Sequence, residues 1–404
     1  MDSIPDATPK TIDGAELIRR ARVMVPTLAQ RAPQVEQDRI VPKETIAELQ
    51  SAGLFRVMQP KRWGGYELSF DVANEIQMIL AEGCVSTAWV FAVIAVEAFL
   101  LAIFDDRAAQ DVWGNDPSTL TSGTSAADPK NTLTQVEGGF RLSGKWRFAS
   151  GCDHCDWTFL GAAIPGSDGA PPTDWRLLLP RKDYRIVDTW FVSGLKGTGS
   201  RDVIVENAFI PAHRALKQLD LFNCTGPGLA INTGALYRIP FGQVFAFSVS
   251  TLVVGGLQAM LDAFTAYGAK RIARGIGATA RDPVAQLLCA ETAATIDEIK
   301  TIFRRNIANL EAYAERKEVP PLRERMQYKF QLAFAIERAS LLAARLFKAA
   351  GASGIYVENT PFARLFADIN AGRQHVNNQF EPAGRAWGGV MLGISESENR
   401  DRFL

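Results

Sequence analysis

The sequence predicts an α+β protein in which an N-terminal helical domain, a central β-barrel or β-sandwich domain and a C-terminal four-helix bundle follow one another. Helical spacing of apolar residues governs roughly residues 11–115 and again the chain from about 235 onward. Short alternating runs separated by Gly and Pro fill the middle. A chain of 404 residues is also too long for one simple core. We expect domain boundaries that give 1–117, 118–222 and 223–404.

The N-terminal block contains several predicted helices. The first begins after Ile12 and repeats apolar residues at helical spacing. The second has Pro42 next to its first turn and ends at Gly53, as proline and glycine do at helix ends. Two more helices are expected at 70–80 and 86–104.

The central block is expected to consist of strands. Residues 132–136 and 140–146 alternate in polarity, and Glu137-Gly138-Gly139 between them is typical of a hairpin turn. Further strands are predicted at 157–164, 175–180, 184–190 and 202–210.

The C-terminal block has four long helical segments, predicted at 244–268, 283–315, 322–350 and 361–385. Antiparallel packing into one bundle is the economical way to bury their apolar faces.

Composition excludes several classes of protein. The formal net charge is zero and 22% of residues are charged, so no overall field favours nucleic acid or an anionic membrane. The longest apolar run, 88–104, is broken by Glu97 and falls short of the roughly 18 residues that span a bilayer. The polar N-terminus has no signal-peptide pattern, and five cysteines suit reduced thiols. We expect a cytoplasmic protein.

Cys152 and Cys155 lie on either side of His154 in a Cys-x-x-Cys spacing. A redox or metal role is one interpretation, but no second pair of ligands follows at the spacing of a zinc site. We favour structural cysteines and expect no metal.

Several local patterns resemble the acyl-CoA dehydrogenase superfamily. Pro60–Gly65 resembles its Pro-x-x-Tyr-Gly-Gly turn, and 83–89 resembles the start of its buried helix. Residues 194–200 with 203–211 resemble the strand pair that closes its β domain. Their order and spacing cover nearly the whole chain, and the resemblance implies the helix, β domain, bundle layout.

Within that superfamily the chain is more similar to flavin-dependent monooxygenases than to dehydrogenases. Thr198-Gly199-Ser200 is typical of that branch, and Trp146–Gly151 resembles its flavin-contacting motif. Where a dehydrogenase has a catalytic glutamate, this chain has His375, with no carboxylate between Asp368 and Glu381. It resembles oxygenase components of two-component systems, such as p-hydroxyphenylacetate 3-hydroxylase and the seco-steroid hydroxylases.

The resemblance implies a reaction. Reduced flavin (FMNH2 or FADH2) would come from a separate NAD(P)H:flavin reductase and form a C4a-hydroperoxide with O2, which hydroxylates a small aromatic substrate. Arg274–Gly277 is no Rossmann fingerprint, because no strand-helix unit surrounds it. The resemblance also implies a homotetramer.

The resemblance suggests that four residues contact the flavin: Trp146, Ser150, Gly151 and Ser125. Ser150 is the candidate partner of flavin N5, next to Gly151 and in the motif that includes Trp146. The alternative is a plain strand-end serine. Ser125 lies in a segment that faces flavin or substrate in the relatives, although such Ser/Gly clusters are usually turns.

His375 is the candidate base or proton relay, because its usual pKa of about 6.5 allows proton transfer at working pH. The alternative is an interior histidine on a helix face. Glu97 stands where phenol-hydroxylating relatives have a histidine. It is a candidate to accept a hydrogen bond from substrate or to deprotonate it, and the alternative is an ion pair with an arginine inside the fold.

The remaining candidates have weaker support. Asn378, with Asn377, is expected to orient flavin or substrate, or to cap a helix. By resemblance, Arg271 or Arg274 contacts the flavin phosphate of a neighbouring subunit, and a solvated helix end is the alternative. Two rival functions stay open: an acyl-CoA dehydrogenase or oxidase, and a catalytically silent flavin-binding protein.

Overall fold

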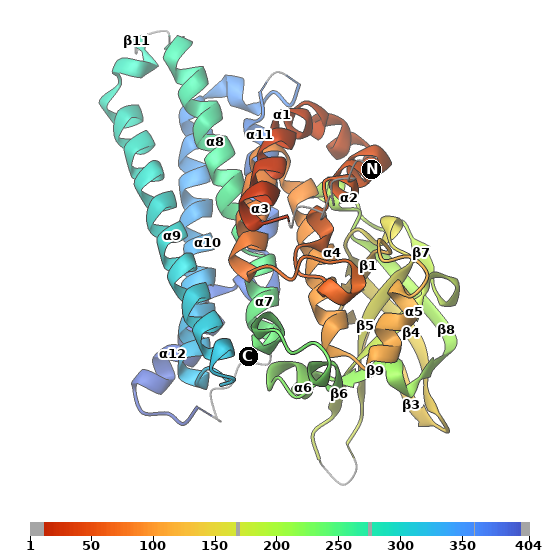
Figure 1. Ribbon diagram of the computed structural model, residues 1–404. Coiled ribbons are helices and arrows are strands. Elements are labelled where there is room, and N and C mark those ends of the chain that lie inside the picture. Colours follow the sequence, from red (N-terminus) through yellow and green to blue (C-terminus); the bar gives the residue numbers. More distant parts are fainter. Residues whose placement is uncertain (1–11, 167–169, 274–276, 359, 397–404) are drawn as a thin grey trace, which may run out of the picture.

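The computed structural model describes residues 12–166, 170–273, 277–358 and 360–396. Its N-terminal part is helical, as predicted (Figure 1). The helices are α1 (Gly14–Asp38), α2 (Lys43–Ser51), α3 (Phe70–Gly83), α4 (Val85–Ile103) and α5 (Asp106–Trp113). Pro42 precedes α2 and Gly53 follows it with a φ of 76°, which explains why that helix stops there.

The middle of the chain forms a β domain made of two sheets. Its strands are β1 (Thr121–Thr124), β2 (Ala126–Ala127), β3 (Thr132–Val136), β4 (Gly139–Ala149), β5 (Trp157–Ile164), β6 (Thr173–Pro180), β7 (Arg185–Val187), β8 (Arg201–Pro211) and β9 (Ala215–Lys217). One sheet has the order β1-β5-β6-β9, and the other β2-β4-β8-β7 with β3 beside β4. The predicted hairpin is confirmed, since Thr132 pairs with Ser143 and Val136 with Gly139. Apolar side chains of both sheets, such as Leu142 and Leu177, form one core, so the domain is a sandwich.

The C-terminal part contains the predicted bundle. Its elements are α6 (Gln218–Phe222), α7 (Phe241–Ser248), α8 (Thr251–Lys270), β10 (Ile272–Ala273), β11 (Gly277–Ala278), α9 (Pro283–Glu315), α10 (Leu322–Ala350), α11 (Phe362–Arg373) and α12 (Phe380–Met391). The helices α8, α9, α10 and α11 pack together, and α12 packs on α10. Short 3-10 turns, including η3 (Cys152–His154), η5 (Lys196–Thr198) and η11 (Val376–Asn378), connect elements along the chain.

Two predicted helices are interrupted, and both interruptions lie at the site described below. The segment predicted at 244–268 divides into α7 and α8 around Val249 and Ser250. The segment predicted at 361–385 divides into α11 and α12, with η11 between them. Apolar residues continue on both sides of Val249 and Ser250, which explains why the pattern did not reveal the first interruption. At the second, residues 373–379 are polar except for Val376, and this polar run was the available signal.

Helix α4 is the central core helix. It lies between the β domain and the bundle (Figure 1), and it contacts β1, α7 and α8. All of its residues are buried, including Glu97 at 1% exposure. Among the described residues, α4 and the span 241–270, which comprises α7 and α8, are long and apolar enough to cross a membrane. Because 100% and 83% of their apolar windows are buried inside the protein, they are weak evidence for a membrane.

Candidate active site

Ser150 lies where strand β4 turns toward helix α4. Gly151 has a φ of 69°, and a Cβ there would meet Val90 Cγ1 at 3.1 Å, so the turn packs tightly on the helix. This brings the Ser150 hydroxyl against α4, where Trp89 Nε1 donates to its Oγ at 3.1 Å. Ser150 is 6% exposed, so this hydroxyl is positioned by the protein and little by water.

Three hydroxyl groups extend inward from Trp89 as a connected chain. Ser150 Oγ lies 2.6 Å from Ser200 Oγ, which lies 2.6 Å from Thr198 Oγ1. Thr198 Oγ1 donates to the Leu195 carbonyl at 2.9 Å. We call Ser150, Ser200 and Thr198 the hydroxyl relay. Thr198 and Ser200 were predicted only as part of a family pattern. The signal for the relay was a pair of hydroxyl residues two positions apart, just before β8.

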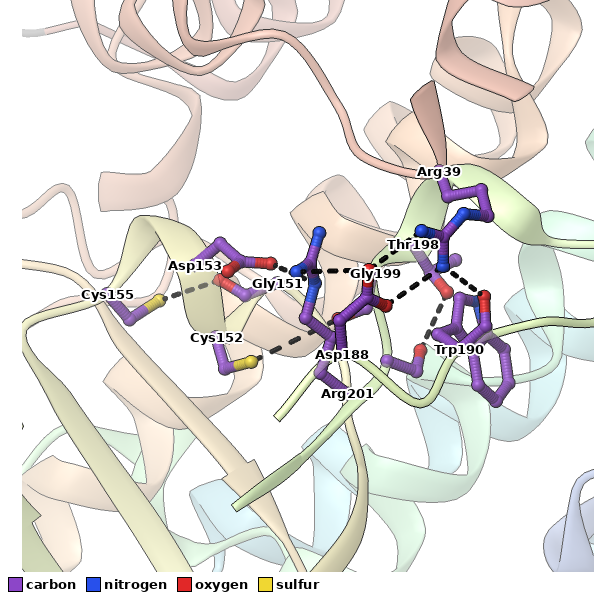
Figure 2. Close-up of polar contacts among 11 residues, drawn as sticks. Arg39, Gly151, Cys152, Asp153, Cys155, Asp188, Trp190, Thr198, Gly199 and Arg201 are labelled. Carbon is purple, nitrogen blue, oxygen red and sulfur yellow. Dashed lines mark hydrogen bonds and ion pairs between the residues drawn. The ribbon is translucent and has the colours of Figure 1, made fainter. Parts of the chain in front are cut away.

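An ionic cluster holds this turn in place (Figure 2). Arg201 Nε lies 2.8 Å from an Asp153 oxygen, and its Nη1 lies 3.6 Å from Asp188. Arg39, the left-handed residue that ends α1, contacts both oxygens of Asp188 at 2.7 and 2.9 Å and donates to the Trp190 carbonyl at 3.0 Å. The cluster therefore joins the N-terminal helices to Arg201 at the start of β8, next to Ser200.

The two cysteines of the Cys-x-x-Cys spacing point at backbone carbonyls. Cys155 Sγ lies 3.5 Å from the Gly151 carbonyl, and Cys152 Sγ lies 4.0 Å from the Gly199 carbonyl (Figure 2). Burial raises the pKa of Cys152 to about 12 and the pKa of Cys155 well above its usual range. The thiols are therefore protonated and poorly reactive. Within the described residues, no group of three or more His, Cys, Asp or Glu could hold a metal ion.

His375 lies in the turn between α11 and α12, rather than on the continuous helix that the sequence predicted. Its ring meets Trp89 and Phe245 edge-on, at centroid distances of 5.7 and 5.8 Å. Its Nδ1 accepts from the Asn377 backbone N–H at 3.2 Å. Burial, and next the charge of Lys329, lower its pKa to about 4. At neutral pH the ring is therefore uncharged, and the Asn377 N–H on Nδ1 leaves the ring hydrogen on Nε2. The predicted role of His375 as base or proton relay stays a prediction.

Asn378 fixes the turn that carries His375. Its Nδ2 donates to the carbonyls of Gly372 at 2.8 Å and Val249 at 3.1 Å, and its Oδ1 accepts from Ser250 Oγ at 2.6 Å. The side chain, 2% exposed, thus joins the interruption between α7 and α8 to the interruption between α11 and α12. Both hydrogens of its amide are used inside the protein, which is the pattern of a residue that holds a turn. Its predicted role in orienting flavin or substrate stays a prediction.

At the far end of α4, Glu97 faces Arg176 of β6. Both are buried, at 1% and 3% exposure. Arg176 Nη1 donates to Ser125 Oγ, and within the described chain its Nε and Glu97 Oε2 have no hydrogen-bond partner. Burial raises the pKa of Glu97 to about 7 against the opposing effect of Arg176, and burial lowers the pKa of Arg176. A Cβ at Gly123 would lie 2.0 Å from Glu97 Oε1, so only glycine fits beside this carboxyl.

The predicted ion pair of Glu97 with an arginine is only partly present. Arg176 is its electrostatic partner, yet no direct salt bridge joins the two among the residues that the structure describes. Arg176 was not among the predicted site residues. The signal was a charged residue among the apolar residues of the strand at 175–180.

A continuous strip of side chains connects these two ends. On α4, Trp89, Val93 and Glu97 share one helix face at four-residue spacing. On α7, Phe241 and Phe245 stack at 5.7 Å; the Arg176 guanidinium lies 5.8 Å from Phe241, and the His375 ring follows Phe245. The structure therefore brings the predicted Ser150 and His375 together at one end, and the predicted Glu97 and Ser125 together at the other.

Three other residues were predicted to contact flavin, and the contacts of Arg271 and Arg274 with a neighbouring subunit stay predictions. Trp146 is 0% exposed in the sandwich core, where its Nε1 donates to the Gly161 carbonyl at 2.7 Å, so no part of it reaches the site. Arg271 donates to the Ala349 carbonyl at 2.8 Å and thereby caps α10 of its own chain. Arg274 lies outside the described residues.

The site's residues fit a flavin ring system. Ser150 Oγ keeps a free acceptor position. The Asn377 N–H bonds to His375 Nδ1, which leaves the Nε2 hydrogen of His375 for a ligand. Trp89 and Phe245 provide aromatic edges. Asn377 Oδ1, buried and without a hydrogen-bond partner in the described chain, is a further acceptor beside His375. Such a set can hold a planar, partly polar heterocycle by its edge.

Comparison with known proteins identifies the family. Residues 16–104 match the acyl-CoA dehydrogenase N-terminal domain, and residues 247–380 match its C-terminal domain. The oxygenase subunit HsaA of a flavin-dependent monooxygenase from Rhodococcus jostii is 36% identical over 94% of this chain and 97% of that protein. The oxygenase component of an FADH2-dependent resorcinol hydroxylase from Rhizobium sp. is 31% identical over 94% of each chain.

A solved structure agrees with this assignment. The crystal structure of 3-HSA hydroxylase from Rhodococcus sp. RHA1 superposes with a TM-score of 0.90 at 34% identity, over 97% of this chain and 100% of that one. The helix, sandwich and bundle layout is therefore that of the acyl-CoA dehydrogenase fold. The chain belongs to the oxygenase components of two-component flavin-dependent monooxygenases, enzymes that use reduced flavin supplied by a separate reductase.

Proposed function

We propose that this oxygenase hydroxylates a small phenol, with the flavin ring beside Ser150 and His375 and the phenol hydroxyl between Glu97 and Arg176. One observation carries the proposal. A continuous strip of side chains joins the end with Ser150 and His375 to the end with Glu97 and Arg176, where two buried polar groups are unsatisfied. Unpartnered buried polar atoms are costly, and a ligand that satisfies them is bound in preference to one that does not.

At the flavin end, the protein's residues hold and shield the ring. When bound, reduced flavin supplies the electrons that activate oxygen. Ser150 is the partner of N5, and the neutral His375 donates its Nε2 hydrogen to a developing negative charge nearby. Trp89 and Phe245 exclude water from this region, because their rings close around His375.

At the substrate end, Glu97 and Arg176 complement a phenol hydroxyl. The O–H donates to Glu97 Oε2, while its oxygen accepts from Arg176 Nε; these are the two atoms that lack partners. A phenol has a pKa of about 10, and Glu97, with its pKa raised to about 7, is a stronger base than an ordinary carboxylate. The Arg176 cation then stabilises the phenolate, which makes the ring more reactive toward an electrophilic oxygen.

The names of relatives support this substrate class. Resorcinol and p-hydroxyphenylacetate, which appear in two of them, are phenols. Paired compounds test it: a set of small phenols and their O-methyl ethers, each assayed with a flavin reductase, NADH and O2 for product formed per O2 consumed. We expect product from at least one phenol and none from its ether, because the ether has no hydrogen for Glu97. Equal turnover of a phenol and its ether contradicts the proposed binding of the phenol hydroxyl by Glu97 and Arg176. No product from any compound, with oxygen use equal to that of the reductase alone, favours the silent flavin-binding alternative.

We further propose a cytoplasmic homotetramer with either FMN or FAD as carrier of the reducing equivalents. Large apolar side chains are exposed on the outer bundle helices, among them Val284 at 72%, Leu287 at 65% and Leu341 at 56%. Exposed apolar residues in one region favour a subunit contact. Light scattering checks this: a species near the chain mass of 44.2 kDa rules the tetramer out.

A further inference from the structure

The hydrogen bonds of the relay can run in only one direction. Trp89 Nε1 is a donor and nothing else, and the Leu195 carbonyl is an acceptor and nothing else. Between them each hydroxyl has one hydrogen to give. Because Thr198 gives its hydrogen to Leu195, Ser200 must give its own to Thr198, and Ser150 must give its own to Ser200.

This count leaves Ser150 as an acceptor toward any further ligand. Its single hydrogen is directed to Ser200, one lone pair receives Trp89 Nε1–H, and one lone pair is left. Water has little access to the relay: Thr198, Ser200 and Ser150 are 2%, 4% and 6% exposed. Solvent therefore cannot readily supply a substitute donor or acceptor, and the protein itself sets the direction.

We propose that Ser200 and Thr198 are positioning residues that hold Ser150 as an acceptor, so that the site selects reduced flavin over oxidised flavin. The inference rests on the proposed placement of flavin N5 beside Ser150. In reduced flavin N5 carries a hydrogen, which Ser150 accepts. In oxidised flavin N5 carries only a lone pair, and two acceptors facing each other repel. The oxygenase thereby retains reduced flavin, which its reductase supplies, and releases oxidised flavin, which it cannot use.

Oxidised flavin can bind only if the relay reverses. Ser150 would turn its hydrogen to N5, Ser200 would donate to Ser150, and Thr198 would donate to Ser200 and give up its bond to Leu195. The Leu195 carbonyl keeps the Trp190 Nε1–H at 3.0 Å, so reversal loses one hydrogen bond without leaving a buried carbonyl unpaired. One such bond corresponds to about a five-fold change in an equilibrium constant.

The test measures flavin affinity and needs no turnover. Dissociation constants for oxidised flavin and, without oxygen, for reduced flavin give a ratio for the wild type and for Ser200→Ala, Thr198→Val, Ser150→Ala and Ser122→Ala. Ser122 is the matched control: a fully buried hydroxyl of the same domain that bonds Thr158 at 3.1 Å, outside the relay. Circular dichroism and melting curves verify that each variant folds.

We expect the wild type to prefer reduced flavin, and both Ser200→Ala and Thr198→Val to lower that preference about five-fold, because each frees the Ser150 hydrogen to point at N5. Ser122→Ala should leave the ratio unchanged. The same change appears as a potential of bound flavin about 20 mV lower in the two relay variants, since a tenfold change is about 30 mV for two electrons.

Two failures are distinguishable. If Ser150→Ala changes the ratio while both relay variants match the wild type within experimental error, the relay does not set the direction, although the flavin placement stands. If Ser150→Ala also leaves both affinities unchanged, N5 does not lie beside Ser150, and the proposed placement fails together with the inference.

Discussion

The two ends of the strip along α4 handle buried polar groups in opposite ways. At the Ser150 end, the hydroxyls of Ser150, Ser200 and Thr198 satisfy one another and end on a carbonyl. At the Glu97 end, Glu97 Oε2 and Arg176 Nε have no hydrogen-bond partner among the described residues. A satisfied network is rigid and serves to hold a group in one orientation. An unsatisfied pair gains hydrogen bonds only when a ligand binds, so it favours binding of a ligand that supplies them. The Ser150 end therefore serves to position a group, and the Glu97 end serves to recognise one.

Removing the base at the unsatisfied end should have the largest effect. Glu97→Gln keeps the shape but loses the basic oxygen, so we expect phenol hydroxylation to fall by about 10²- to 10⁴-fold. Product formation with supplied reduced flavin measures this. The matched control is Glu75→Gln on α3, a carboxylate paired with Arg304 at 3.1 Å on the surface. If Glu97→Gln retains wild-type rates, Glu97 is not the base, and the proposed role of the Glu97 end in substrate recognition is contradicted.

The same variant changes the dependence of stability on pH. The folded-state pKa of Glu97 is raised to about 7, above its usual value near 4.3. Its contribution to folding is therefore fully present below about pH 4.3 and is lost as pH rises through about 7. We expect Glu97→Gln to gain stability relative to wild type across that window and to keep the gain above it. Urea unfolding at pH 5, 6, 7 and 8 measures the difference; a constant difference contradicts the raised pKa.

At the satisfied end, His375→Ala should lower hydroxylation by about 10²- to 10³-fold, the loss typical for one preorganised donor.

Because the pKa of His375 is lowered to about 4, the ring stays neutral above about pH 5, and the wild-type rate should show no titration near 6.5. His213→Ala is the control, since His213 pairs with Asp111 at 2.7 Å away from the strip. If the imidazole of His375 itself titrates near 6.5 by NMR, the donor assignment is overturned.

Asn378→Ala should weaken the fold more than the chemistry. It removes three buried hydrogen bonds between the two helix interruptions, which we expect to cost on the order of 2–3 kcal/mol in unfolding free energy. Asn223→Ala, an exposed residue after α6, should change stability by less than about 0.5 kcal/mol. Denaturant titration compares them. Equal stability of both variants would show that Asn378 does not hold the His375 turn.

The smallest effect is expected at the cysteines. Cys152→Ala should leave hydroxylation within about two-fold of wild type, because the pKa of this thiol is raised to about 12 and it stays protonated. Treatment with a chelator should not lower the rate either. A loss of activity with chelator would reveal a metal that the residues described here do not indicate.

Local patterns were enough to predict most of the architecture. Pro283 and Glu315 bound α9, and Leu322 and Ala350 bound α10, as the apolar periodicity indicated. The hairpin around Gly138 followed from its turn residues. These features depend on backbone conformation and on which face of an element is apolar, and both properties are encoded within short stretches of sequence.

The tertiary structure decided what the sequence left open at the site. The interruptions before α8 and before α12 depend on Asn378, which bonds across 129 residues to Val249. Whether Glu97 pairs with an arginine depends on where β6 places Arg176, and the His375 pKa depends on Trp89, Phe245 and Lys329 from three other helices. The sequence by itself determined most of the elements, the family and most of the candidate residues, because these are local properties. Partners, burial and hydrogen-bond direction required the tertiary structure, because they arise only when distant segments pack together.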